Sequence, residues 1–253
     1  MERAERILIW GKVLGTFFMS FGGVKGIIYS SADTTENLLI GKSLIRFGDG
    51  EFGIYRGKSI HYQKWTPTLK QAFEKIKSDY ENDPSECPYI LAVPRRFMTI
   101  SGWKLMEKRL YVSCWSESRY DFKKKFRHDI PYGDAFLFEK DNKEIYSKLW
   151  SSSVCPDNVI FVHNSEQYAR GFADTYQKNV TFVKCPGRDA FEAVDILEKE
   201  VVKVIESNAW STKDVMITIS AGPAGKVLVY RLSKYGYWSI DAGHCWDDPL
   251  EGI

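Results

Sequence analysis

Short apolar runs alternate with longer amphipathic stretches along most of the chain, and this alternation limits the fold more than any other feature of the sequence. Strands are predicted at residues 43–47, 89–93, 159–162, 181–184 and 215–219, with a last strand that begins at 237–240. One helix is predicted to follow a cap at Ser31 or Asp33 and to end at Leu39. Three more helices are predicted over residues 69–80, 190–207 and 222–233. Strands that alternate with helices form crossover units, which build a parallel sheet between helical layers. The sequence therefore predicts a single Rossmann-like α/β domain, with a mainly parallel sheet and helices on both faces.

The composition excludes several classes of protein. Hydrophobic residues make up 44% of the 253 residues, which is enough for one sizeable core. The 35 Lys and Arg residues are nearly balanced by 33 Asp and Glu residues, so no nucleic-acid partner is expected. The cysteines form no close pair of the zinc-ribbon or redox type, which favours a reduced, cytoplasmic compartment; they are Cys87, Cys114, Cys155, Cys185 and Cys245.

Residues 1–30 form an apolar N-terminal extension without an uninterrupted run of 18 apolar residues and without a convincing signal cleavage site. One alternative is an amphipathic helix on the inner face of a membrane, with Lys12 and Lys25 facing lipid phosphates. Its headgroup-facing side chains would be Trp10, Phe17, Phe18, Phe21 and Ile28. The other alternative is a first helix packed on the core. Residues 98–150 show no clear pattern and are expected to form an excursion over the active face.

The tripeptide Asp49-Gly50-Glu51 directly follows the predicted strand at 43–47. Parallel α/β sheets bind ligands beyond the carboxyl ends of their strands, so this turn is a candidate site. Two carboxylates separated by one small residue can converge on a divalent cation, and oxygen ligands favour Mg²⁺ or Mn²⁺. A solvated acidic turn is the alternative. Arg46 can serve an anionic ligand or pair with a carboxylate.

A glycine-rich turn at residues 220–226 follows the strand at 215–219 and opens a helix. Backbone N–H groups and the positive helix end at Gly222, Pro223 and Ala224 would suit a diphosphate. The turn is not a Walker A loop, because Ser220 replaces a required glycine. The alternative is an ordinary strand-to-helix turn in which Lys226 is a solvated helix residue.

Two histidines also follow predicted strands. His244 lies among glycine and acidic residues after the last strand, where it can complete a metal site begun by Asp49 and Glu51. His163 follows the strand at 159–162, with Glu166 nearby, and is the second candidate.

These features, in this order, resemble the bacterial GT-D glycosyltransferases, a family first catalogued as a domain of unknown function and typified by glucosyltransferases that act on streptococcal serine-rich adhesin glycans. Residues 46–52 are similar to the family's R-F-G-D-G-E-F signature, and residues 220–229 and 240–244 are similar to its G-P-T-A-x-V-L-A and A-I-D-I-G-H elements. Weaker matches occur at residues 62–63, 118–120 and 186–191. His163-Asn164 departs from the V-E-G that the family tends to carry after a central strand.

The resemblance implies a GT-D-like domain over residues 31–253 that moves a sugar from a UDP-sugar donor to a glycan acceptor, lipid-linked or protein-linked, in polysaccharide or glycoprotein glycan synthesis. It implies catalytic Asp49 and Glu51, which hold Mn²⁺ or Mg²⁺ with His244. The candidates for donor contacts are Arg46, Phe47, Gly48, Gln63, Arg119, Tyr120, Arg188, Gly222, Pro223 and Ala224. The base is left open among His163, Glu166 and Asp247, and a homodimer is left open as well.

Two other functions would use the same residues. A metal-dependent phosphohydrolase of nucleotides or sugar phosphates would consume the donor without an acceptor. A non-catalytic nucleotide-binding partner of a glycan-assembly complex would bind UDP without turnover, and the departure at His163 keeps this alternative open.

Overall fold

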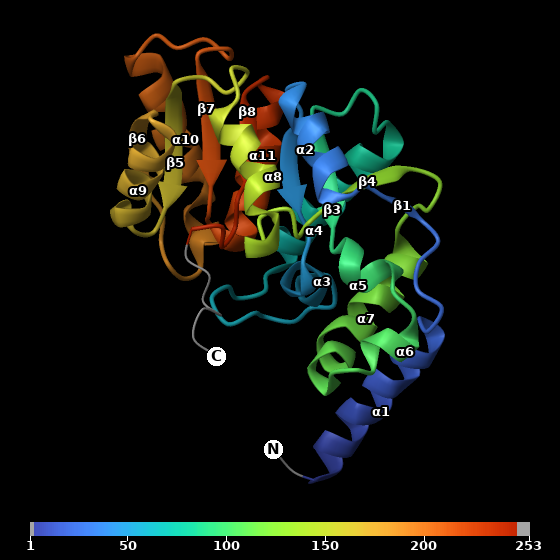
Figure 1. Cartoon of the computed structure of the whole chain (residues 1–253). Coiled ribbons are helices and arrows are strands. Elements are labelled where there is room, and N and C mark those ends of the chain that lie inside the picture. The colour runs from blue at the N-terminus through green and yellow to red at the C-terminus, as the bar shows by residue number, and fades with distance from the viewer. Residues whose placement is uncertain (1–2, 247–253) are drawn as a thin grey trace.

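The computed structural model describes residues 3–246, with side chains from Trp10 onward, and its centre is an eight-stranded sheet in which every strand pairing is parallel (Figure 1). The strand order is β1-β4-β3-β2-β8-β7-β5-β6. The strands are β1 Ile27–Ile28, β2 Ser43–Arg46, β3 Tyr89–Val93, β4 Pro131–Asp134, β5 Asn158–His163, β6 Asn179–Lys184, β7 Val215–Ile219 and β8 Trp238–Asp241. The predicted parallel α/β fold is confirmed.

The strand order brings β2 and β8 side by side at the centre, with Leu44 aligned with Ile240. From β2 the chain moves through β3 to β4 on one side, whereas β8 is reached through β7 from the other side. The connections therefore diverge where β2 and β8 meet. Open α/β sheets bind their ligands at such a switch point, beyond the carboxyl ends of the strands.

Helices cover both faces of the sheet (Figure 1). On one face, α4, α10 and α11 contribute Phe73, Val201 and Leu228 to a buried cluster. On the other face, α2, α8 and α9 contribute to a second cluster, for example through Trp150 and Phe172. The helices are α1 Arg3–Met19, α2 Ser31–Leu39, α3 Asp49–Tyr55, α4 Pro67–Asn82, α5 Arg95–Thr99, α6 Gly102–Leu105, α7 Arg109–Lys125, α8 Lys143–Ser151, α9 Glu166–Tyr176, α10 Val194–Ser207 and α11 Gly222–Lys234, with 3₁₀ turns at Lys140–Asn142 and Ala190–Ala193.

Residues 98–150 are more regular than the sequence suggested. They do not form one excursion, because β4 joins the sheet, α8 covers a face, and α6 and α7 belong to a separate group of helices. β4 was missed because its sequence, Pro-Tyr-Gly-Asp, is typical of a turn. Its glycine is required by packing: a Cβ on Gly133 would lie 2.9 Å from Cγ2 of Ile90 on β3.

The N-terminal helix packs against the protein along one side. α1, α5, α6 and α7 form a lobe beyond the carboxyl edge of the sheet (Figure 1), held by an apolar cluster that includes Val13, Phe17, Leu105 and Trp115. The expectation that Phe17 and Ile28 face a membrane is wrong, since they are 3% and 8% exposed. None of the helices in residues 3–246 is long and apolar enough to cross a membrane.

Arg119 is the central polar residue of this lobe and does not line the pocket at the strand ends. Its side chain is 0% exposed, and its Nη1 donates to the carbonyl oxygens of Phe97 (2.6 Å) and Ile100 (2.8 Å). Its Nη2 donates to the carbonyl oxygen of Ser20 at 2.6 Å. Burial lowers the pKa of this guanidinium to about 10. The prediction that Arg119 contacts the donor is therefore corrected: from α7 it ties the segment after α1 to α5 and to the residue after α5.

Replacing Arg119 with Met should lower the free energy of unfolding by roughly 3 kcal/mol, because three buried carbonyl oxygens lose their donor. Urea titration followed by tryptophan fluorescence measures the change. Arg188→Met is the control; its side chain is exposed, so a change within about 0.5 kcal/mol is expected. An Arg119→Met variant with unaltered stability but lost nucleotide binding would contradict the structural role.

Candidate active site

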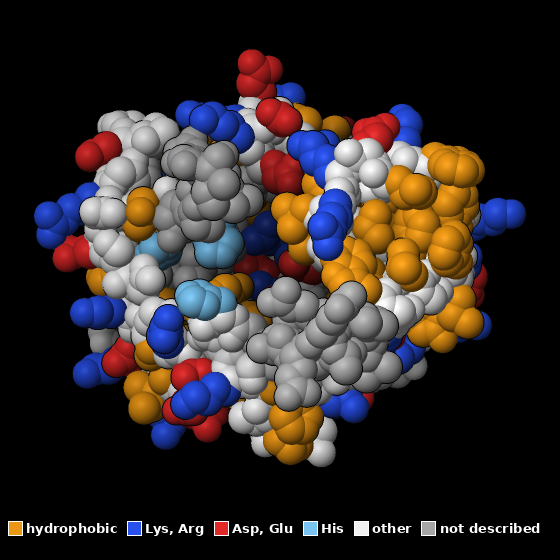
Figure 2. All heavy atoms as spheres, turned by 90° about the horizontal axis from the view of Figure 1, so that it is seen from below, with side chains coloured by type: hydrophobic (Ala, Val, Ile, Leu, Met, Phe, Trp, Pro, Cys, Tyr) orange, Lys and Arg blue, Asp and Glu red, His pale blue; other side chains and the backbone are white. Residues whose placement is uncertain are grey.

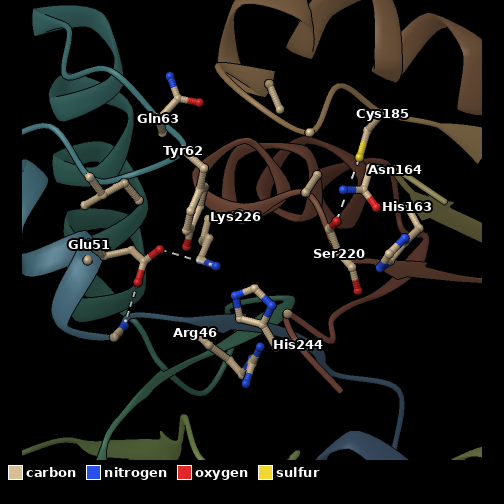
Figure 3. A pocket seen from close by; sticks show the side chains of 18 of the residues that line it. Arg46, Glu51, Tyr62, Gln63, His163, Asn164, Cys185, Ser220, Lys226 and His244 are labelled. Carbon is tan, nitrogen blue, oxygen red and sulfur yellow. Dashed lines mark hydrogen bonds and ion pairs between the residues drawn. The ribbon is translucent and has the colours of Figure 1, made fainter. Parts of the chain in front are cut away.

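A pocket of about 470 Å³ opens at the carboxyl edge of the sheet. Most of its lining residues lie just after the neighbouring strands β2, β8, β7, β5 and β6, and Ala135 and Phe136 follow β4. Figure 2 looks into this hollow, with histidine side chains at its rim and charged side chains deeper inside. In Figure 3, Glu51 and Lys226 lie on one side, His163 and Asn164 on the other, and His244 between them. The turns that the sequence singled out after β2, β7 and β8 thus converge on one cavity.

The acidic turn forms the start of α3. Gly48 adopts an extended conformation as the N-cap, and its N–H donates to Oε2 of Glu51 at 2.7 Å. This contact satisfies one of the free amides at the helix start and fixes the Glu51 carboxylate at the pocket. Partial loss of hydration at the pocket, and then the neighbouring charge of Glu51, raise the pKa of Asp49 above its ordinary value, although its side chain is exposed. A cation at the pocket would relieve this repulsion.

Lys226 lies buried between two carboxylates. Its Nζ is 3.4 Å from Oε1 of Glu51 and 3.1 Å from Oδ2 of Asp241 (Figure 3 shows the Glu51 contact). Burial alone would lower the pKa of this lysine, but Asp241 and Glu51 hold it above its ordinary value. The alternative of a solvated Lys226 is wrong, because the residue is only 5% exposed. Lys226 therefore brings a fixed positive charge to the pocket floor.

Arg46 supplies a second positive charge. Its Nε donates to the carbonyl oxygen of Asp241 at 2.8 Å, and its Nη1 donates to that of Ala135 at 2.9 Å. A Cβ on Gly243 would overlap the guanidinium, and Gly243 has a φ of +53°, so glycine is needed there for both reasons. The alternative in which Arg46 pairs with a carboxylate is confirmed by its contact with Asp241 at 3.8 Å, and contact with an anionic ligand stays a prediction for a residue that also lines the pocket.

The start of α11 closes another part of the pocket wall. Gly222 has a φ of +53°, and a Cβ there would lie 2.7 Å from Cε2 of Tyr62, so a glycine lets the Tyr62 ring pack against the turn. Gly222 lines the pocket, whereas Pro223 and Ala224 are buried behind it. The first amides of a helix have no intrahelical partner and attract anions. The hydroxyl of Ser220 is also buried and has no hydrogen-bond partner within the described chain.

The opposite wall carries His163, which is 2% exposed at the end of β5. Its Nδ1 accepts a hydrogen bond from the backbone N–H of Ser165 at 3.0 Å. In a neutral imidazole this leaves the proton on Nε2, which makes that atom a donor. In this state Nδ1 is already occupied and Nε2 carries the proton, which argues against His163 as the group that removes a proton.

The predicted site residues divide into two groups. The structure places Arg46, Gly48, Asp49, Glu51, Gln63, His163, Gly222 and His244 around the pocket. It places Phe47, Tyr120, Glu166, Arg188, Pro223 and Ala224 away from the lining, in addition to Arg119. Glu166 is exposed and pairs with Arg170 on α9 at 3.1 Å. Asp247 lies outside the described residues.

Sequence reasoning missed several lining residues, namely Tyr62, Asn164, Cys185 and Ser220, and did not place Lys226 in the site. Asn164, Cys185 and Ser220 each directly follow a strand, so strand-end position was a usable signal. Lys226 carried another signal: it is a lone charge among the buried apolar residues of α11.

No group of three His, Cys, Asp or Glu side chains within residues 3–246 is arranged to hold a metal ion. The three-ligand set of Asp49, Glu51 and His244 is therefore not preformed. Two carboxylates nevertheless fit Mg²⁺, which takes one or two protein carboxylates and fills its remaining positions with water and substrate phosphates. The donor set thus fits a cation that binds together with a phosphorylated ligand.

Comparison with curated proteins identifies two streptococcal relatives. Glycosyltransferase GlyD of Streptococcus pneumoniae serotype 4 is 27% identical over 237 residues, which cover 87% of this chain and 26% of GlyD. Probable glycosyl transferase Gly of Streptococcus gordonii is 22% identical over 217 residues, which cover 81% of this chain and 30% of that protein. The chain thus spans less than a third of the length of either relative.

Comparison with solved structures shows the same fold. A structure described as a new glycosyltransferase from Streptococcus sanguinis aligns with a TM-score of 0.70 and 22% identity, over 88% of this chain and 83% of that chain. A domain of unknown function described as having a distinct glycosyltransferase fold aligns with a TM-score of 0.70 and 20% identity, over 93% and 83%. The sequence model described as Glycosyltransferase GT-D fold matches residues 44–248, from β2 past the end of β8. Because this match covers most of the chain, the protein belongs to the GT-D glycosyltransferase family.

Proposed function

We propose that this protein transfers a sugar from a UDP-sugar to a hydroxyl group of a glycan, with Mn²⁺ or Mg²⁺ held by Asp49 and Glu51. The observation that carries the proposal is the pocket at the strand ends, in which two carboxylates, a buried lysine and a helix start surround one cavity. Family membership supports glycosyl transfer as the reaction.

The charges of the pocket suit a diphosphate leaving group. Departure of the nucleoside diphosphate develops negative charge, and fixed positive groups lower the barrier most when they need no rearrangement. Lys226 and Arg46 are held in place by protein contacts, and the start of α11 offers backbone N–H groups. A bound cation would neutralise further phosphate charge. Asp49 and Glu51 would hold it, with His244 as a candidate third ligand.

The opposite wall is assigned to the sugar or the acceptor. His163, Asn164 and Ser220 are the polar side chains that line this wall. Glu166 is not assigned as the base, because its ion pair with Arg170 keeps it on the exposed side of α9.

Asp49→Asn should abolish Mn²⁺-dependent binding of UDP, since a neutral amide cannot replace the carboxylate as a cation ligand. Calorimetric titration with UDP, with and without Mn²⁺, measures this effect. Glu166→Gln is the matched control and should bind UDP as the unchanged protein does, because Glu166 lies outside the pocket lining. Normal metal-dependent binding by Asp49→Asn would refute the proposed cation site. Hydrolysis of UDP-sugar at full rate without any acceptor would favour a phosphohydrolase.

Gly222→Ala should weaken UDP binding by about tenfold, or about 1.4 kcal/mol, because the added methyl group displaces Tyr62 and strains a backbone with positive φ. Titration calorimetry and urea unfolding separate a loss of affinity from a loss of stability. Gly171→Ala is the control on α9, where a Cβ meets nothing within 4 Å; it should leave affinity unchanged and stabilise the helix slightly. Equal affinity for UDP in both variants would show that the Gly222 turn does not contact the nucleotide.

A further inference from the structure

The lobe of α1, α5, α6 and α7 carries exposed apolar side chains that the proposed transfer reaction does not use. We call these residues the lobe patch: Leu14, Phe18, Met19, Trp103, Met106 and Leu110, which are 45–71% exposed. In Figure 2, hydrophobic side chains gather on the side of the molecule that carries this lobe. We propose that the lobe patch docks the protein onto an anionic lipid bilayer, beside the mouth of the pocket.

The lobe patch is a second apolar face, distinct from the one that holds the lobe together. Val13 and Phe17 on α1 pack into the lobe cluster, whereas Leu14 and Phe18 point outward and stay exposed. Trp103 contacts Phe21 edge-on, with ring centroids 5.2 Å apart, yet remains 71% exposed. A group of large apolar side chains left in water on one lobe is the usual mark of an interaction surface.

The charged residues around the lobe patch indicate which kind of partner binds it. Lys104, Lys108 and Arg109 lie within or beside the patch, with Glu107 as the one acidic residue between positions 101 and 110. Apolar side chains bordered by basic ones match a bilayer surface with anionic headgroups, which attract nearby Lys and Arg side chains.

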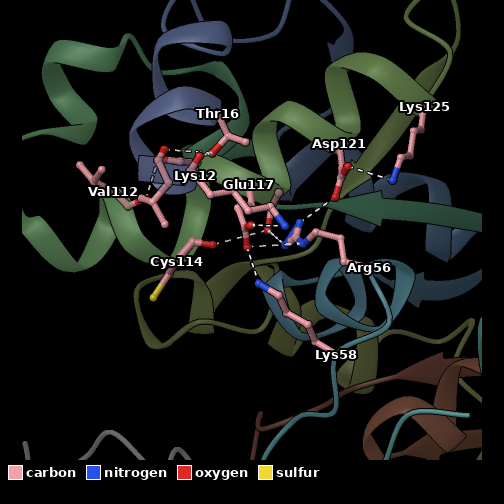
Figure 4. A network of polar contacts seen from close by, with 12 residues as sticks. Lys12, Thr16, Arg56, Lys58, Val112, Cys114, Glu117, Asp121 and Lys125 are labelled. Carbon is pink, nitrogen blue, oxygen red and sulfur yellow. Dashed lines mark hydrogen bonds and ion pairs between the residues drawn. The ribbon is translucent and has the colours of Figure 1, made fainter. Parts of the chain in front are cut away.

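A polar network connects the lobe to the helix that starts with the acidic turn (Figure 4). Arg56, at the end of α3, contacts Asp121 of α7 at 2.7 Å and Glu117 of α7 at 3.6 Å. Lys12 of α1 contacts the same Glu117 at 3.5 Å. Because α3 begins at Asp49, the lobe and the pocket are held in a fixed relation.

Docking through the lobe patch would therefore set the pocket mouth close to the membrane surface, since Figure 2 shows both on one face of the molecule. An acceptor anchored by a lipid could then reach the pocket without leaving the bilayer. This last consequence rests on the proposed transfer reaction, whereas the membrane docking does not.

The test is co-sedimentation of the full chain with two kinds of vesicle, pure phosphatidylcholine and phosphatidylcholine mixed with phosphatidylglycerol. We expect binding to the anionic vesicles, weakened by salt, and a loss of about tenfold or more when Phe18→Glu, Trp103→Glu and Leu110→Glu are combined. The matched control combines Ile40→Glu and Ile196→Glu, at positions 78% and 59% exposed outside the lobe, and should bind vesicles as the unchanged chain does. Circular dichroism of all three proteins reports on folding, and UDP titration reports separately on the donor site.

Three results would overturn the proposal. The unchanged chain could fail to bind either kind of vesicle, or the lobe variant and the control could lose binding equally. Analytical ultracentrifugation could also reveal a dimer that the lobe variant alone breaks, with no vesicle binding; the lobe patch would then be an interface between copies of this chain. If the unchanged chain does not bind UDP, the proposed function is contradicted, whereas the vesicle result still stands.

Discussion

The buried ammonium group of Lys226 is the contact on which the pocket depends. It joins three elements that are distant in the sequence: α11, which carries the lysine, α3 through Glu51, and the end of β8 through Asp241. Charges taken out of water are tolerated only when they are paired, and removing one partner leaves the others uncompensated, at a cost of about 3–5 kcal/mol. The acidic turn, the helix start and the central strands are therefore positioned together, and the ammonium group of Lys226 lies at the pocket floor between two carboxylates.

This contact is possible because of the strand order. β2 and β8 are neighbours at the centre of the sheet, so Arg46 and Asp241, at their ends, meet directly. β7 lies next to β8 and delivers the Ser220–Gly222 turn to the same edge. The cavity thus forms where the chain reverses its direction of progress across the sheet, and its polar groups come from strand ends instead of one continuous motif.

Polar contacts of α7 hold the lobe together and attach it to the rest of the protein. Arg119 of α7 donates hydrogen bonds to carbonyl groups of α5, of the residue after α5, and of the segment that follows α1. Glu117 and Asp121, also on α7, form ion pairs with Arg56. One helix, α7, therefore both assembles the lobe and fixes it to α3. The burial of Phe17 beside the exposed Phe18 was not predicted, because an apolar helix carries no local signal for which of its faces meets protein.

The sequence by itself determined the parallel α/β architecture, the positions of six strands and the turns that reach the pocket, since alternating apolar runs and turn residues are encoded locally. It also determined Asp49, Glu51 and His244 as strand-end candidates. Only the tertiary structure decided that Lys226 is buried between two acids, that Arg119 lies in the lobe, and that Pro-Tyr-Gly-Asp forms β4. The physical reason is the same in each case. The environment of a charge or a glycine is set by residues distant in the chain. Which distant residues become neighbours depends on the strand order, and no local sequence pattern predicts that order.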